Sequence, residues 1–196
     1  MVDQQRQRID KNTKAPKIGH PTFAAVKDAF PDCRFRATEF RGQSTLIVEP
    51  ADLHKVLKFL RDDERTKYNF LSDVIGIDYL NYPAETIGRF AVVYMIVSHE
   101  RDDRFWVKTY LDPSIPTEST TPDPALEIDS ACSVWPGAEW PEREVYDMFG
   151  IRFKDHPDLR RILTWADYPA HPLRKDYPLR GRGERESYRV VDRSSS

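Results

Sequence analysis

An unbroken run of eight apolar residues, Phe90–Val97, limits the fold of this chain more than any other feature. Its β-branched and aromatic content predicts a strand in the middle of a sheet, covered on both faces. The run is far too short to cross a bilayer as a helix. The next segment, Phe105–Leu111, alternates between apolar and polar residues. It should therefore pair with the first strand across the polar turn Ser98–Arg104.

The remainder of residues 20–112 supplies partners for these two strands. Three further segments have strand-like patterns: Arg34–Phe40, Ser44–Glu49 and Phe70–Leu80. Arg41-Gly42-Gln43 predicts a hairpin turn between the first two, and Gly76 suggests a bulge in the third. Helical spacing predicts one short helix capped by Thr22 and another that carries Leu53, Val56, Leu57 and Leu60. The order of elements predicts an α+β domain of two layers, a mixed sheet of about five strands with helices packed on it.

The length of 196 residues and the 39% apolar content suit one such domain with extensions. Residues 1–19 are polar and aperiodic, which predicts a disordered leader. Residues 113–150 form a proline-rich connecting loop and a helix, and residues 151–196 an extended C-terminal arm. The arm carries 11 basic and 7 acidic side chains, whereas residues 1–150 carry 19 basic and 25 acidic ones. This asymmetry favours an arm that leaves its own domain to contact another surface.

The helix before the arm has clear start and stop signals. Pro141 suits its first position, Glu142 and Glu144 complement its positive end, and Gly150 can terminate it. This pattern predicts that Val145, Met148 or Phe149 is buried. It also predicts that Arg143 and Asp147, four positions apart, are exposed.

The arm holds two related motifs, His156-Pro157-Asp158-Leu159-Arg160-Arg161 and His171-Pro172-Leu173-Arg174-Lys175-Asp176-Tyr177. Each proline favours an extended conformation at the histidine before it. The leucine of each motif can then dock while the arginine reaches a carboxylate. Aromatic and arginine-rich segments are typical of interface anchors. We therefore expect these residues to dock on a partner: Trp140, Glu142, Arg143, Glu144, Asp147, His156, Pro157, Leu159, Arg160, Arg161, His171, Pro172, Leu173, Arg174, Lys175, Asp176 and Tyr177.

Chemical interpretations of the same residues are weaker. Glu142, Glu144 and Asp147 suggest acid–base or metal chemistry, but Glu142 and Glu144 are two apart and so point to different faces of a helix. Interaction with the helix dipole and an ion pair with Arg143 explain these carboxylates better. A metal site from His156 and His171 lacks helical ligand spacing. Acidic residues interleave with the arginines of the arm, which argues against nucleic acid as a partner. A free-standing metalloenzyme that uses both histidines remains a distant alternative.

No cofactor or metal site is expected in this chain, and no catalytic set is evident. Cys33 and Cys132 lie far apart and no Cys-x-x-Cys occurs, so a cluster held by this chain alone is not expected. The polar N-terminal stretch lacks the apolar segment of a signal peptide, and no segment suits a membrane span. We therefore expect a soluble, cytoplasmic protein.

The string Glu142-Arg143-Glu144-Val145-Tyr146-Asp147-Met148-Phe149-Gly150-Ile151, followed by both His-Pro motifs, closely resembles the signature of the C subunit of NADH-quinone oxidoreductase, respiratory complex I. The resemblance is dense over 130–180 and looser over 20–112. Asp155 and Ala170 stand where the family commonly has glycine, so the turns before the two histidines are expected to differ.

The resemblance implies a structural, non-catalytic subunit in the quinone-reducing module of the peripheral arm of a proton-translocating complex. Its partners would be the quinone-site subunit (D) and neighbouring cluster-carrying subunits. FMN, iron–sulfur clusters, NADH and quinone would be bound by other chains. The complex would lie at the cytoplasmic side of the cell membrane, with this chain peripheral to it. The equivalent subunit of a membrane-bound hydrogenase-type or ferredoxin-quinone complex is the alternative that this signature leaves open.

Overall fold

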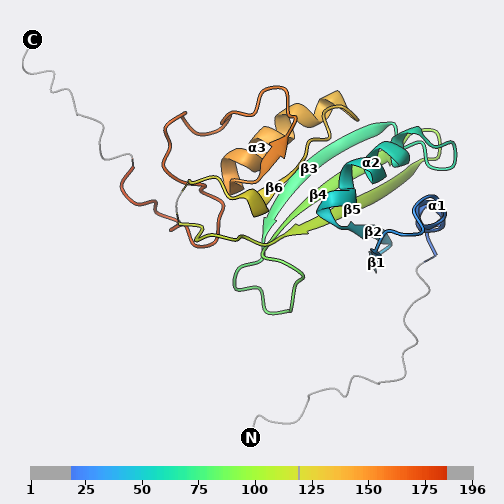
Figure 1. Ribbon diagram of the computed structural model, residues 1–196, viewed down its shortest axis with the longest axis horizontal. Coiled ribbons are helices and arrows are strands. Elements are labelled where there is room, and N and C mark those ends of the chain that lie inside the picture. The colour runs from blue at the N-terminus through green and yellow to red at the C-terminus, as the bar shows by residue number, and fades with distance from the viewer. Residues whose placement is uncertain (1–18, 119, 185–196) are drawn as a thin grey trace, which may run out of the picture.

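A computed structural model describes residues 19–118 and 120–184 (Figure 1). The predicted leader, apart from Gly19, and the arm beyond residue 184 lie outside the described residues. The predicted boundaries between the α+β domain, the connecting segment and the arm, at residues 112 and 150, stay a prediction.

A five-stranded mixed sheet forms the centre of the molecule. Its strands are β1 (Phe35–Phe40), β2 (Gln43–Val48), β3 (Phe70–Asp78), β4 (Phe90–Ser98) and β5 (Asp103–Leu111), in the order β1-β2-β5-β4-β3. Only β2 and β5 run parallel; the other neighbours are antiparallel. The predicted α+β class and mixed sheet are therefore confirmed. The predicted hairpin is also present, with Arg41 at φ 51° and Gly42 at φ 76° in the left-handed region that a tight two-residue turn needs.

Three helices, α1 (Pro21–Ala29), α2 (Leu53–Asp62) and α3 (Glu139–Phe149), accompany the sheet. Single 3₁₀ turns occur at Pro50–Asp52, Pro124–Leu126 and Pro136–Ala138. A separate parallel pair joins β6 (Glu127–Asp129) to β7 (Arg152–Lys154). The four predicted α2 residues are all fully buried, each contributing roughly 1.5–3 kcal/mol. They pack on alternate residues of the sheet, so one face of the sheet and the helices enclose the core.

Two local predictions are wrong. Thr22 does not cap α1: its N–H donates to Nδ1 of His20, which is the N-cap residue, and its hydroxyl bonds Tyr68 inside the domain. The register shift in β3 lies between Leu71 and Asp73, not at Gly76. Gly76 instead permits close packing, since a Cβ there would meet the Phe149 ring at 2.5 Å.

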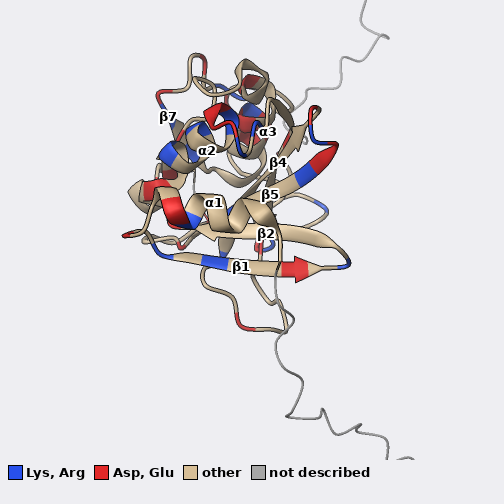
Figure 2. Cartoon of the chain, turned by 90° about the vertical axis from the view of Figure 1, so that its right-hand side faces the viewer, with Lys and Arg blue, Asp and Glu red and all other residues tan. Residues whose placement is uncertain are grey.

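Figure 1 shows α3 alongside β3, with the chain after α3 running back over this end of the molecule. Figure 2 shows charged residues on the helices and near strand ends, with few along the strands apart from β1. Within the described residues, no helix has the length and apolar character needed to cross a membrane.

Candidate docking site

The helix α3 and residues 151–184 form the candidate site, and the buried carboxylate of Asp147 lies between them. One carboxylate oxygen of Asp147 accepts from the Arg161 guanidinium at 2.7 Å and from the Thr164 hydroxyl at 2.5 Å. The other accepts from the backbone N–H groups of Ile162, Leu163 and Thr164 at 2.7–3.0 Å. Burial alone would raise the pKa of Asp147, but these hydrogen bonds hold it below its usual value. Asp147 therefore fixes the turn after the first His-Pro motif.

The second His-Pro motif binds the C-terminal end of α3, where helix carbonyls lack partners within the helix. His171 Nδ1 donates to the Asp147 carbonyl at 2.9 Å, and the Leu173 N–H donates to the Met148 carbonyl at 3.1 Å. Arg174 Nε donates to the Phe149 carbonyl at 2.7 Å. Three consecutive carbonyls are thus satisfied by the arm. Burial lowers the pKa of His171 to about 4, so its ring is neutral at pH 7.

Gly150 ends α3 at φ 75°, as predicted. It also allows the arm to approach the helix end. A Cβ at this position would clash with Arg174 Nη2 and lie 2.6 Å from His171 Nε2. The glycine is therefore required by both its backbone conformation and its neighbours.

A cluster of ion pairs joins the second motif to the sheet. Arg89 pairs with Asp78 at 3.0 Å and with Asp176 at 2.8 Å, and Asp78 also accepts from the Lys175 N–H at 2.8 Å. Arg89 and Asp78 were not predicted as site residues. No local pattern marks them, because Asp176 lies 87 positions away from Arg89 in the chain.

Glu142 lies at the start of α3, wholly buried. Its carboxylate accepts from the Ser130 hydroxyl at 2.6 Å and the Ala131 N–H at 2.7 Å. The predicted ion pair with Arg143 is wrong. Burial raises the pKa of Glu142 to about 7 and that of the Cys132 thiol to about 12.

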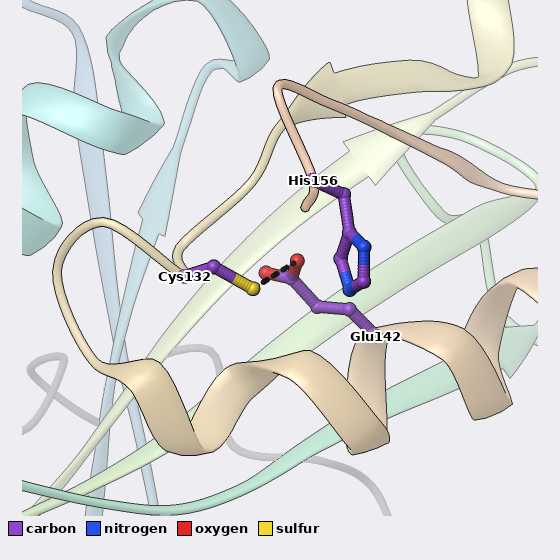
Figure 3. A group of neighbouring side chains, drawn as sticks. All are labelled: Cys132, Glu142 and His156. Atoms are coloured by element: carbon purple, nitrogen blue, oxygen red, sulfur yellow. Dashed lines mark hydrogen bonds between the residues drawn. The ribbon is translucent and has the colours of Figure 1, made fainter. Parts of the chain in front are cut away.

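The Cys132, Glu142 and His156 side chains point toward one another (Figure 3). One possible ligand atom from each lies within 4.8 Å of the others. His156, however, receives the Asp158 N–H at Nδ1 and donates from Nε2 to the Glu139 carbonyl, both at 3.0 Å. With the Glu142 oxygens also engaged, a metal ion would have to displace existing hydrogen bonds. Hydrogen bonding explains this group more simply than metal binding.

The prediction that Arg143 and Asp147 are exposed is wrong, since both are buried. Arg143 donates to the carbonyls of Arg160 and Arg161 at 3.2 and 3.4 Å. Helical spacing placed the two residues on one face, but the arm covers that face. The predicted burial of Val145, Met148 and Phe149 is confirmed.

The predicted docking residues thus divide into two sets. One set makes contacts inside the chain. Eight of its members join the arm to the rest of the chain: Arg143, Asp147, His156, Leu159, Arg161, His171, Arg174 and Asp176. Glu142 instead bonds Ser130 and Ala131, and Tyr177 bonds Tyr168 within the arm. The other consists of exposed side chains: Trp140, Glu144, Pro157, Arg160, Leu173 and Lys175. Pro172, half-buried, lies between the two sets. The two residues that stand where the family commonly has glycine, Asp155 and Ala170, have different backbone conformations. Asp155 has φ 60°, the left-handed conformation that glycine adopts freely, whereas Ala170 is buried and has no positive φ.

Replacing Glu142 by glutamine tests its raised pKa. A carboxyl whose folded pKa lies above its unfolded value of 4.5 contributes stability at low pH and loses it as the pH rises toward 7. We expect the E142Q variant to gain up to about 3 kcal/mol relative to the parent between pH 4.5 and 8. Urea unfolding of both proteins across that range measures the difference, and a gap that does not vary with pH contradicts the assignment. Comparing the pair at each pH cancels the opposite contribution of His171.

The fold and site define a two-layer α+β protein whose C-terminal arm caps and covers its last helix. Residues 46–183 match the family described as respiratory-chain NADH dehydrogenase, 30 Kd subunit. The C subunit of the NADH-quinone oxidoreductase of Citrifermentans bemidjiense is 46% identical over 84% of this chain and 91% of its own length. The C subunit of Roseiflexus sp. is 40% identical over 79% of this chain and 80% of its own length. The chain belongs to the family of C subunits of NADH-quinone oxidoreductase.

Solved structures agree with this assignment. The trypsin-resistant fragment of Nqo5 aligns with a TM-score of 0.55 and 28% identity, covering 70% of this chain and 99% of the fragment. A chain of an archaeal membrane-bound sulfane sulfur reductase aligns with a TM-score of 0.62 at 18% identity, which shows likeness of fold alone. The family resemblance drawn from the signature residues is therefore confirmed.

Proposed function

We propose that this chain is a structural subunit in the peripheral arm of a proton-translocating NADH-quinone oxidoreductase, in its quinone-reducing module. It docks on the quinone-site subunit and supports electron transfer from NADH to quinone without binding FMN, clusters, NADH or quinone itself. The complex holds it peripherally at the cytoplasmic side of the cell membrane. The observation that supports this proposal is that the family signature comprises both α3 and the arm segments that pack on it.

The exposed set supplies the contact surface in this proposal. Trp140, 63% exposed, and Leu173, 52% exposed, lie on elements that buried neighbours fix in place. An exposed tryptophan on a rigid support resembles an interface anchor, and the leucine adds apolar contact area. Arg160 adds an exposed guanidinium to this surface. It forms an ion pair at 2.8 Å with Asp158, which is itself half-exposed.

The function is tested by removing the chain from its host. Membranes of the deletion strain should lose NADH-dependent quinone reduction, and a plasmid copy should restore it. Retention of full activity without the chain would contradict the proposal.

Arg160 and Arg174 give a matched pair of arginine substitutions within the two motifs. We expect R160A to weaken assembly into the complex while leaving stability within about 0.5 kcal/mol of the parent. R174A should instead destabilise the chain, because Arg174 is buried against backbone carbonyls. Native gels report assembly and urea unfolding reports stability. Equal effects of the two variants on both measurements would argue against the division into two sets.

A further inference from the structure

One face of the central sheet is apolar and has no covering layer within the described residues. We call it the outer face, the face turned away from the three helices. Strand register places one row of side chains across all five strands, from Ile75 through Val93, Lys108 and Ile47 to Arg36. A neighbouring row on β4 and β5 brings Met95 opposite Trp106.

None of these residues belongs to the core cluster that packs against the helices. Val93, at the centre of the sheet, is buried among its neighbours at 9% exposure, whereas Ile75 is 38% exposed. Alternate residues of the same strands, such as Tyr94 and Val107, are fully buried against the helices. An antiparallel sheet with one face in water normally has polar residues on that face. The apolar run Phe90–Val97 predicted a strand covered on both faces. On the outer face of β4, Ala91 and Val93 are buried, whereas Met95 and Val97 are partly exposed. An exposed apolar face of this kind marks an interaction surface.

The charges of the outer face indicate the kind of partner. Arg36, Arg104 and Lys108 form no ion pair with any carboxylate that the structure describes. Lys108 Nζ donates to the Tyr79 hydroxyl and lies 4.7 and 4.5 Å from the ring centroids of Tyr79 and Tyr110. Asp73 is the single acidic residue that the described strand register places on the outer face. Its carboxylate accepts from the N–H of Val74, the next residue in the strand.

Two hollows lie at opposite ends of this face, each beside one of the cations. The first, about 350 Å³, is lined by Phe70, Met95, Trp106 and Arg104 among others. The second, about 170 Å³, is lined by Arg36, Ile47 and Tyr110 among others. Both hollows have an apolar floor and a cation that lacks a described ion pair. Carboxylates also line them, Asp102 and Asp103 in the first and Glu49 in the second. This arrangement suits apolar side chains flanked by carboxylates.

We propose that the outer face is a second docking surface, distinct from the arm, for a different protein subunit whose contact patch is apolar with carboxylates around it. The proposal rests on the proposed function, since that subunit belongs to the same complex. A second copy of this chain fits less well, because pairing two such faces would bring six cations together with two carboxylates.

The test uses the native complex purified through a tag on this chain. Carbodiimide joins a lysine to a carboxylate in direct contact, so mass spectrometry should find Lys108 linked to an acidic residue of an identified subunit. The K108E variant should lower recovery of that subunit by about tenfold or more, because it places like charges in contact. The K58E variant, on the exposed side of α2, is the matched control and should behave as the parent.

Circular dichroism of the K108E variant checks that it is folded, and we expect the spectrum of the parent. I75S, at an exposed position of the same row, gives a second variant that changes no charge and should also lower recovery. Parent-like recovery of both variants overturns the proposal, while recovery of the complex by the parent protein leaves the proposed function standing. Links from Lys108 only to this same chain, or Lys108-dependent binding to phosphatidylglycerol vesicles, also overturn it. If the parent protein recovers no other subunit, both proposals fail.

Discussion

Replacing Asp147 by alanine is expected to lower the free energy of unfolding by about 3–5 kcal/mol. The substitution leaves the Arg161 guanidinium buried without its carboxylate. It also removes the acceptor for three consecutive backbone N–H groups. Urea unfolding followed by tryptophan fluorescence measures the loss. Because the turn after the first motif depends on Asp147, trypsin should also cut the variant sooner after Arg160 or Arg161.

Glu144 provides the control for this substitution. It lies on the same helix and is exposed, so E144A should change stability by no more than about 0.5 kcal/mol. A loss below about 1 kcal/mol in D147A would mean that the hydrogen bonds of Asp147 do not hold the arm in solution.

Replacing Gly150 by alanine is expected to cost about 2–5 kcal/mol. Part of this comes from placing a Cβ on a residue with φ 75°, and the rest from contact with Arg174 and His171. The strain can be relieved only if the second motif moves away from the end of α3. Limited proteolysis of the arm and urea unfolding should therefore change together.

Gly137 is the matched glycine for comparison. It has no positive φ, and a Cβ there would meet nothing within 4 Å. G137A should stay within about 0.5 kcal/mol of the parent or gain slightly. Equal effects of the two substitutions would show that the arm does not press against Gly150.

The sheet was predictable because each strand carries its own pattern. The run Phe90–Val97 and the stripe Leu53–Leu60 place apolar groups at spacings that only one kind of element satisfies. The αL end of α3 followed from Gly150 for the same local reason. Where capping depended on a neighbour, as with His20 in place of Thr22, local rules selected the wrong residue.

The sequence identified the segment that forms the candidate site but not its geometry. The motifs identified the segment, yet the sequence could not tell an arm that packs on its own domain from one that leaves it. Asp147 and Arg143 looked exposed because helix periodicity says nothing about a later segment that covers them. Arg89 and Asp78 were missed because their partner Asp176 comes from a distant part of the chain, and such pairing depends on the whole fold.

The central claim is that this chain works as a subunit of a larger electron-transfer complex. Purification of the tagged chain from detergent-solubilised membranes of its native host tests it most directly. The account predicts that the quinone-site subunit and cluster-carrying subunits are recovered with it in equal amounts. Recovery of the chain alone, under conditions where the complex remains active, would contradict the account.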